Sequence, residues 1–368
     1  MGFSPGLEGV IADRTAISNV EGDIGRLSYR GYPIESLVQQ DYESVLWLVL
    51  FGEMPSPAER ERLVRFLTEH GPLDDHELAL LERIDHERHP MRVLQGMIPL
   101  LSTGDARFDG LSDEGAQGLH IIARLPTLIA AWRGITTRGS VPSFDGSAPC
   151  LENFLTMFNG ETPNAEALDV LKTVQILQME HSFNAGTFTA RVAASTLAPV
   201  DAVCSAAVGA LFGRLHGGAD EAALLDAKAV GSPEGAEAFV DDLLARKGRL
   251  MGMGHREYRK VDPRAVILKP LAAKLCAGTK HQNVFDTLCR IEAVFNARMA
   301  EKGKEVWANL EFYKGPVYEA LGIPANYFTA VFAMSRAIGW LAHFVESRAD
   351  NRIMRPKAEY VGPGPREI

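Results

Sequence analysis

The chain is short of cysteine and has no long hydrophobic run near its start. Its four cysteines are scattered and include no CxxC pair: Cys150, Cys204, Cys276 and Cys289. In a chain of 368 residues this scatter predicts reduced, buried thiols and a cytoplasmic location, and it argues against a disulfide framework or a zinc site. The apolar run VLWLVLF is far too short to span a membrane, and the start lacks the basic and apolar regions of a secretory signal.

An excess of positive charge is also absent, because the formal net charge is −9. Nonspecific nucleic-acid binding depends on excess lysine and arginine, so the negative net charge argues against that class of function. A local basic cluster in such a chain is therefore expected to bind a specific small anion. The length permits two domains, and 46% hydrophobic with 23% charged residues is typical of an ordinary globular protein.

Alternating strand patterns are few, apart from a possible short pair within residues 9–32. Helix signals dominate. Ser56-Pro57-Ala58-Glu59 combines an N-cap, a first-turn proline and a glutamate three residues on, which predicts a helix reaching Gly71. Ser232-Pro233 predicts another helix, closed by Gly248. Apolar residues recur at helical spacing in two later stretches: Leu288, Ile291, Phe295 and Met299, and Ile338, Leu341, Phe344 and Val345. We predict an all-α fold.

Three histidines lie in settings unlike the others. His181 is in MEHSFNAGT, where a helical stretch from Glu166 ends in asparagine and glycine; His216 is in GRLHGGADEA and His255 in GMGHREYRK. Neighbouring glycines allow the backbone to turn sharply and approach a ligand closely. Each histidine alone would be interpreted as a loop residue, but three together indicate a site. Five further histidines have strongly polar neighbours and are expected at the surface: His70, His76, His86, His89 and His281.

Arginines are the second candidate set. Five stand out by position: Arg256, Arg259, Arg264, Arg336 and Arg355. A guanidinium binds a carboxylate or phosphate through two parallel hydrogen bonds, so such residues suit di-acids and nucleotide phosphates. The alternative is a solvated basic face. We expect that for Arg256, which precedes Glu257, whereas Arg264 follows Asp-Pro and should be more constrained.

The stretch NLEFYKG places Glu311 between apolar and aromatic residues. Partial burial would raise the pKa of its carboxyl and make it a usable base near neutral pH. On its own, a glutamate in this setting is more often a helix N-terminal cap or a partner in an ion pair.

Together these stretches resemble the citrate synthase family over almost the whole chain. The similar segments follow the family's order: residues 6–37, LHGGADEA, GHREYRKVDPRA, NLEFYKG, SRAIGWLAHFVESR and RPKAEYVGP. The resemblance implies an all-α homodimer that couples oxaloacetate to acetyl-CoA and hydrolyses the thioester, with no metal or redox cofactor. It also implies a large domain of residues 1–217 and 323–368 and a small domain of residues 218–322, which close on the substrates.

The resemblance implies a role for each singled-out residue. His216 would bind the thioester carbonyl as it becomes an enol, Glu311 would remove the methyl proton, and His255 would bind and protonate the ketone oxygen. The remaining residues would bind the substrates: His181, Arg264, Arg336 and Arg355 the carboxylates of oxaloacetate and citrate, with Arg355 reaching across the dimer, and Arg259, Leu250, Gly252 and Gly254 the CoA.

The chain departs from the family pattern around this site. The usual motif is N-V-D-F-Y, so Glu311 adds one methylene, and a displacement of about 1 Å can cost about 10²-fold in rate. The acidic pattern before His181 is shifted, Arg214 replaces a common proline, and Asp220 replaces a common asparagine. These changes are compatible with a slow enzyme, a related specificity, or a protein that binds without turnover.

Three alternatives therefore stay open. A 2-methylcitrate synthase would act on propionyl-CoA, and one extra methylene is worth only about 1–3 kcal/mol in a pocket. A non-catalytic homologue would bind acyl-CoA without turnover. A zinc hydrolase built on His181, His216 and His255 is disfavoured, because converging arginines would repel the cation and no HExxH spacing occurs.

Overall fold

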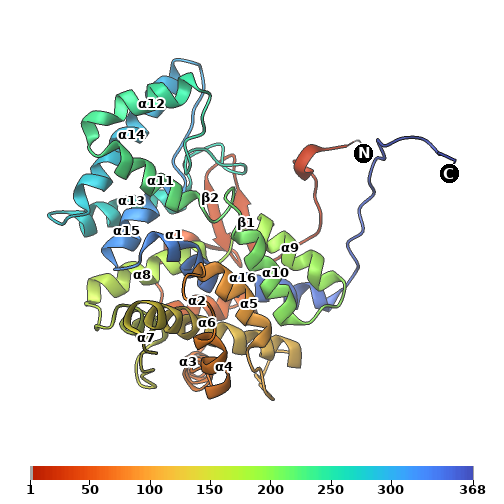
Figure 1. Ribbon diagram of the computed structural model, residues 1–368. Coiled ribbons are helices and arrows are strands. Elements are labelled where there is room, and N and C mark those ends of the chain that lie inside the picture. The colour runs from red at the N-terminus through yellow and green to blue at the C-terminus, as the bar shows by residue number, and fades with distance from the viewer. Residues whose placement is uncertain (1–2, 368) are drawn as a thin grey trace.

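The computed structural model describes residues 3–367, and helices dominate it (Figure 1), which confirms the predicted all-α fold. Within the described residues the α-helices are α1 Ile34–Leu37, α2 Tyr42–Phe51, α3 Pro57–His70, α4 Asp75–Glu82, α5 Pro90–Met97, α6 Asp113–Arg138, α7 Cys150–Asn159, α8 Ala165–Gln178, α9 Ala185–Ser195, α10 Val200–Leu211, α11 Ala219–Val230, α12 Ala236–Ala245, α13 Pro263–Cys276, α14 Gln282–Ala300, α15 Leu310–Ala320 and α16 Phe328–Ala349.

The strands lie in the segment where the sequence suggested them. β1 (Ser18–Glu21), β2 (Arg26–Tyr29) and β3 (Tyr32–Pro33) form one antiparallel sheet in the order β1-β2-β3. Asn19 pairs with Ser28 in its register. The sheet is too small to form a core of its own, and β2 packs against α1.

The core is built around α16, which packs against α2, α6, α8, α9 and α10. Residues 325–349 are long and apolar enough to span a membrane by length and composition. However, 94% of the most apolar part of this segment is buried inside the protein. Gly118 of α6 allows close packing here, because a Cβ at that position would lie 2.3 Å from Cδ1 of Leu341. The apolar character of α16 is thus that of a core helix.

The predicted helix start is confirmed for α3 and wrong for α12. At α3, Ser56 Oγ accepts from the Glu59 N–H and the Glu59 carboxylate accepts from the Ser56 N–H, which is a complete capping box. At Ser232 the side chain makes no capping bond, and a short 3₁₀ turn (Pro233–Gly235) comes before α12. That helix also ends at Ala245, short of Gly248.

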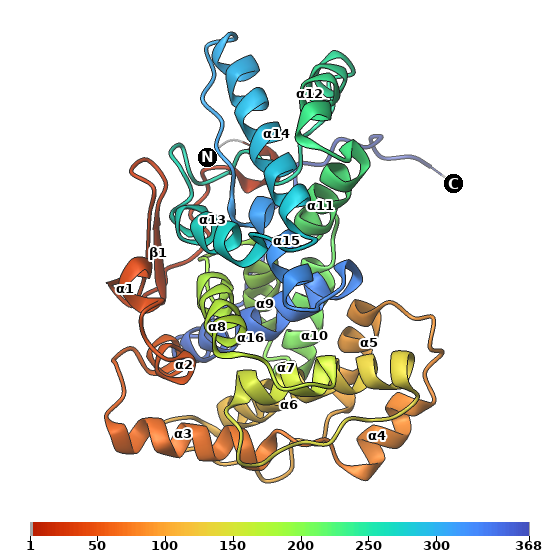
Figure 2. The same ribbon diagram turned by 90° about the vertical axis from the view of Figure 1, so that its left-hand side faces the viewer.

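Figure 2 shows α11, α12, α13 and α14 grouped at one end of the molecule, with α3, α4 and α6 at the other. α15 joins the first group, since it packs against α11 and α13. The helices α8, α9 and α16 lie between the two ends. The division into a domain of residues 1–217 plus 323–368 and a domain of residues 218–322 stays a prediction. Its limits would lie in the turn before α11 and in the turn after α15.

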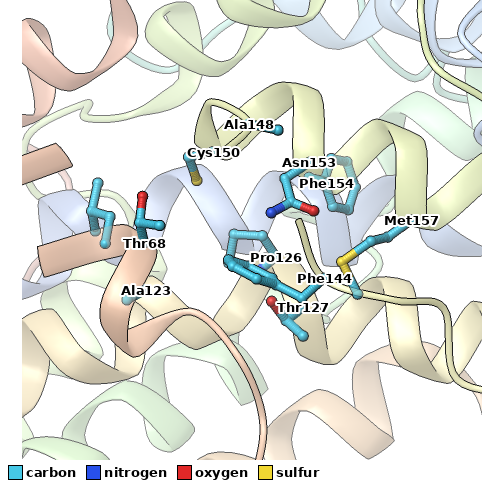
Figure 3. A pocket seen from close by; sticks show the side chains of 11 residues that line it. Thr68, Ala123, Pro126, Thr127, Phe144, Ala148, Cys150, Asn153, Phe154 and Met157 are labelled. Atoms are coloured by element: carbon cyan, nitrogen blue, oxygen red, sulfur yellow. The ribbon is translucent and has the colours of Figure 1, made fainter. Parts of the chain in front are cut away.

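All four cysteines are unpaired, as predicted; Cys204 and Cys276 are buried and the other two are half-buried. Burial raises the pKa of the Cys150 thiol to about 12. Its side chain faces a narrow pocket between α3, α6 and α7, together with Thr68, Pro126 and Asn153 (Figure 3). None of the predicted site residues lines this pocket.

The surface expectation for five histidines is only partly correct. His76 and His86 are exposed, but the other three are half-buried: His70, His89 and His281. His89 accepts a hydrogen bond from the Met91 N–H at the start of α5. The ring of His70 packs 4.5 Å from that of His120, centroid to centroid. Polar neighbours in the sequence predicted exposed side chains, but they do not show which rings and backbone groups the fold brings against these histidines.

Candidate active site

His181 lies in the turn between α8 and α9. The helix before it ends at Gln178, earlier than expected, and Asn184 caps the next helix, α9, by accepting from the Thr187 N–H. The His181 side chain is buried, and its Nε2 lies 3.1 Å from the Tyr258 hydroxyl. Its ring centroid is 5.2 Å from that of His255. The fold therefore brings two of the three singled-out histidines into contact.

The loop that carries His255 is fixed to the start of α15. Gly252 and Gly254 have φ values of 79° and 80°, in the left-handed region that favours glycine. A Cβ on Gly252 would lie only 2.9 Å from Cα of Phe312. The Asn309 N–H donates to the Gly252 carbonyl at 2.9 Å, and its side-chain amide donates to the Gly254 carbonyl at 3.0 Å. Leu250 is buried beneath the loop.

The protonation of His255 follows from this loop. Its Nδ1 accepts from the Glu257 N–H at 3.0 Å and from the Tyr258 N–H at 3.3 Å. An imidazole nitrogen that accepts two backbone donors carries no proton itself, so the neutral ring has its proton on Nε2. Burial and then Arg264 lower the pKa of His255. The ring is therefore a neutral Nε2–H donor.

Asp262 and Arg264 form a buried pair at the start of α13. The Arg264 guanidinium donates to Asp262 through Nε at 3.0 Å and Nη2 at 2.8 Å. The same carboxylate accepts from the Leu310 N–H at 3.3 Å, which ties α13 to α15. Arg264 is 3% exposed, so the constraint expected from its position after Asp-Pro is present.

Glu311 stands in the first turn of α15, half-buried, where its N–H donates to the side chain of the N-cap Asn309 at 3.1 Å. Burial disfavours the charged carboxylate. The positive charges of Lys314 and then Arg264 outweigh burial and lower the pKa of Glu311 to about 2. The raised pKa expected from its apolar neighbours in sequence is therefore wrong, because the neighbouring cations dominate.

His216 lies in the turn between α10 and α11. That turn is closed by the Gly217 N–H, which donates to the Leu211 carbonyl at 2.9 Å. Burial and then Arg336 lower the pKa of His216 to about 4, so its ring is neutral at pH 7. Its Nδ1 is buried and has no hydrogen-bond partner within residues 3–367. A buried polar nitrogen without a partner is costly, so a polar group arriving at this side of the ring would be favoured.

Arg336 supplies a cation from the core helix α16. Its side chain is 1% exposed, and Nε donates to the Gln178 carbonyl at 2.7 Å. The guanidinium carbon lies 4.8 Å from the ring centroid of Phe332, and the ring of His216 packs against the same phenylalanine at 6.3 Å. Arg336 therefore stands at the His216 side of the site.

Six predicted residues influence one another's ionisation and so share one site: His181, His216, His255, Arg264, Glu311 and Arg336. Burial, Arg264 and His255, in that order, hold the pKa of His181 well below its usual range. The set combines neutral imidazoles, two buried guanidiniums and one carboxylate. Such a set can bind a di-acid and move a proton.

Two arginines are not brought to this site. Arg355 lies exposed on the extended segment after α16, where its Nη1 donates to the neighbouring Pro356 carbonyl at 3.3 Å. Arg259 has a side chain that is 83% exposed, and it pairs with Asp23 at 3.2 Å. Arg256 is exposed, as expected.

Sequence reasoning missed the buried carboxylate beside His181. Glu180 is fully buried, and its Oε1 lies 3.0 Å from both the Ser18 hydroxyl and His343 Nε2. Burial raises its pKa, but His343 and Arg336 outweigh this and lower it. The histidine inside the apolar stretch of α16, His343, was a usable signal that a buried polar partner exists.

The second residue that sequence reasoning missed is Lys314, whose ammonium nitrogen lies 3.0 Å from the buried carboxylate of Asp220.

No group of three or more histidine, cysteine or carboxylate side chains is placed to hold a metal ion among residues 3–367. The zinc alternative therefore has no ligand set in that part of the chain. The three histidines of the site instead lie beside arginines, whose charge opposes a cation.

Comparison with known proteins places these residues in context. A family model described as "Citrate synthase, C-terminal domain" matches residues 6–357. The chain is 37% identical over 363 residues to the citrate synthase of Synechocystis sp., covering 98% of this chain and 91% of that protein. It is 35% identical over 365 residues to the 2-methylcitrate synthase of Shewanella oneidensis, covering 99% and 96%.

Solved structures agree with these matches. The citrate synthase of Thermoplasma acidophilum, in a ternary complex with carboxymethyl coenzyme A and oxaloacetate, superposes with a TM-score of 0.92 at 29% identity, covering 100% of this chain and 98% of that one. The citrate synthase of Thermotoga maritima gives a TM-score of 0.88 at 31% identity, covering 99% and 97%.

Proposed function

This chain belongs to the citrate synthase family, and from that premise we propose that it condenses acetyl-CoA with oxaloacetate and hydrolyses the product thioester to citrate and CoA. One observation carries the proposal. A carboxylate, two neutral imidazoles and two buried guanidiniums converge on one site, each influencing the ionisation of others.

The first step is removal of a methyl proton. We assign Glu311 as the base, because its lowered pKa keeps the carboxylate ionised at neutral pH. A thioester methyl is a very weak acid, so the base succeeds only if a preorganised donor stabilises the enol oxygen in a site that excludes water. We assign that donor to the unpartnered Nδ1 of His216. The C–H electron pair becomes the C=C bond of the enol, and the C=O π pair moves to the oxygen, which accepts this hydrogen bond.

The second step is attack of the enol on the ketone of oxaloacetate. His255 is suited to protonate the ketone oxygen, because its Nδ1 is occupied by backbone donors and its Nε2 carries the proton. We propose that Arg336, Arg264 and His181 hold the di-acid carboxylates. Arg264 already shares its guanidinium with Asp262, so Arg336 is the freer anchor.

CoA is proposed to lie along Leu250, Gly252 and Gly254, with Arg259 at its phosphates. The left-handed glycines support this, because backbone without side chains can approach a ligand closely. The exposed side chain of Arg259 supports an electrostatic contact with the phosphates. We further propose that residues 218–322 close as a small domain over residues 1–217 and 323–368. The reaction is proposed to need no metal or redox cofactor.

We also propose a cytoplasmic homodimer, in which Arg355 completes the partner's site. The segment after α16 runs away from the helices (Figure 1), and it carries Arg355 close to the exposed Ile353. Val192 and Leu197, at the end of α9, are also exposed apolar residues. Light scattering on the purified protein tests the dimer, and mixing Arg355→Ala chains with inactive Glu311→Gln chains tests whether hybrid dimers regain activity.

The decisive experiment is release of free thiol by the purified protein with oxaloacetate and either acetyl-CoA or propionyl-CoA. We expect faster release with acetyl-CoA, and a preference for propionyl-CoA would instead assign 2-methylcitrate synthase. Glu311→Asp, with the shorter base usual in the family, is the matched variant. Release only by that variant would identify a natural binding protein without turnover, and silence in both would reject the catalytic function.

A further inference from the structure

Lys314 is a fully buried lysine one turn after the proposed base on α15. Its ammonium nitrogen lies 3.0 Å from Oδ2 of Asp220, 3.2 Å from Oε1 of Gln178 and 4.2 Å from the ring centroid of Phe332. Asp220 is itself fully buried, and its Oδ1 accepts from the Glu221 N–H at 2.8 Å. Four elements therefore fix this one charge: α8, α11, α15 and α16.

Stability alone is a weak reason for such a pair. Removing two charges from water costs several kcal/mol, so a buried ion pair often stabilises a protein no better than apolar residues of the same volume. The position of the pair is more informative. Residues three apart share one face of a helix, so the stem of Lys314 starts on the same face as Glu311.

Among the charged groups that act on Glu311, Lys314 contributes most, followed by Arg264 and His255. Lys314 also acts on His216. Around the ammonium, α11 contributes Asp220, α15 contributes Tyr318, and α16 contributes Arg336, which shares Phe332 with it. From α8, Gln178 contributes only neutral groups: its amide to Lys314 and its carbonyl to Arg336.

We propose that Lys314 is a positioning residue for proton abstraction: anchored by Asp220 and Gln178 one turn further along α15, its charge attracts the Glu311 carboxylate towards one position when acyl-CoA excludes water. The inference rests on the proposed function of the site. Glutamate has one more rotatable bond than aspartate, so a fixed cation one turn further along the same helix favours the conformations that bring the carboxylate towards it. In this step the methyl proton moves to Glu311.

The test removes both buried charges together, in the double variant Lys314→Met and Asp220→Asn, so that neither is left unpaired. Infrared spectra between pH 7 and pH 4 report the protonated carboxyl band, and its loss on adding Glu311→Gln assigns that band to Glu311. We expect Glu311 to be ionised at pH 4 in the natural protein and largely protonated in the double variant. We also expect kcat to fall by about 10- to 100-fold, with a new acid limb in the pH profile of kcat/KM.

The matched control is another buried pair far from the site, between Arg124 of α6 and Glu77 of α4. The double variant Arg124→Met and Glu77→Gln should lower the Tm while leaving the Glu311 titration and the pH profile unchanged. A merely structural role for Lys314 predicts that both double variants behave alike.

The proposal is overturned if Glu311 remains ionised at pH 4 in the double variant and the pH profile superimposes on that of the natural protein. If the double variant does not fold, Lys314→Gln retains the hydrogen bonds without the charge, and the same infrared titration, corrected with Glu311→Gln, decides. If the natural protein releases no thiol, the proposed function fails, but the titration still shows whether Lys314 controls Glu311.

Discussion

On the α8 and α16 side of the site the functional groups are nearly inaccessible, whereas on the α15 side they stand on turns and helix starts. Arg336 is 1% exposed and bonded to the backbone of α8. His255 and Glu311 are only half-buried, and their loop and helix are joined to each other through Asn309. We call the α8 and α16 side, which carries Arg336, the fixed side. We call the α15 side, which carries His255 and Glu311, the loop side.

The difference separates two tasks. Binding a di-acid needs cations held in one place, because an uncompensated buried charge is costly to move. Proton transfer needs groups that approach the substrate after it is bound, which suits half-buried side chains on turns and helix starts. The fixed side therefore serves binding, and the loop side serves the chemistry.

The largest effect should come from the loop side. Glu311→Gln removes the base while retaining size and polarity, and we expect kcat to fall by about 10³-fold or more, since positioned acid–base groups contribute about 10²–10⁴-fold. The binding of oxaloacetate, measured by calorimetry, should change less than about threefold. Weakened di-acid binding with kcat retained would reverse the assignment of the two sides.

On the fixed side, Arg336→Met should act on binding. Loss of a charge-assisted interaction of about 1.5–3 kcal/mol predicts that oxaloacetate binds about 10- to 100-fold more weakly. The KM for acyl-CoA should stay nearly constant in the same thiol-release assay. Equal losses for both substrates would instead indicate general disruption, which circular dichroism would detect.

Neutral histidines should make the protein sensitive to acid. His120, in the core helix α6, and His216, in the turn between α10 and α11, both have a pKa lowered to about 4. The unfolded chain binds these protons near pH 6.5, so the stability is fully present above pH 6.5 and is lost as pH falls through 6.5 towards 4. We expect His120→Gln to reduce the loss between pH 7 and 5 by at most about 2 kcal/mol. Urea unfolding at both pH values measures this loss of stability, and an unchanged loss in the variant would show that folding does not lower the pKa of His120.

Between the two sides, Nε2 of His181 and the Tyr258 hydroxyl share a hydrogen bond at 3.1 Å. Tyr258→Phe removes only the hydroxyl, and at about 0.5–1.5 kcal/mol we expect kcat/KM for oxaloacetate to fall about 2- to 12-fold. Steady-state kinetics measures the change. No change at all would mean that the contact is lost when substrate binds.

The smallest effect should come from Arg259, which is exposed and paired only with exposed Asp23. Surface pairs contribute at most about 1 kcal/mol, so Arg259→Ala should raise the KM for acyl-CoA by about fivefold at most. The difference should shrink as salt is added, because exposed charges are screened. Exposed Arg256→Ala is the control, and an equal effect there would remove Arg259 from the proposed CoA site.

Sequence alone indicated the all-helical fold and the residues that meet in the site, because family motifs, caps and glycine-flanked histidines are local signals. It did not predict the ionisation of Glu311, since Arg264 reaches it from another helix and Lys314 from the next turn. It missed Glu180 for the same reason. The helix predicted after Ser232 is present as α12, but its start was wrong because a 3₁₀ turn ending at Gly235 comes before it.

The bonds of Glu180 also bear on synthesis of the chain. Its carboxylate joins Ser18, 162 residues before it, to His343, 163 residues after it. Contacts between such distant segments form late in folding. We expect the contacts of Glu180 with Ser18 and His343 to form on the ribosome only after α16 has emerged. Prematurely terminated chains should therefore be inactive, however well their first helices pack.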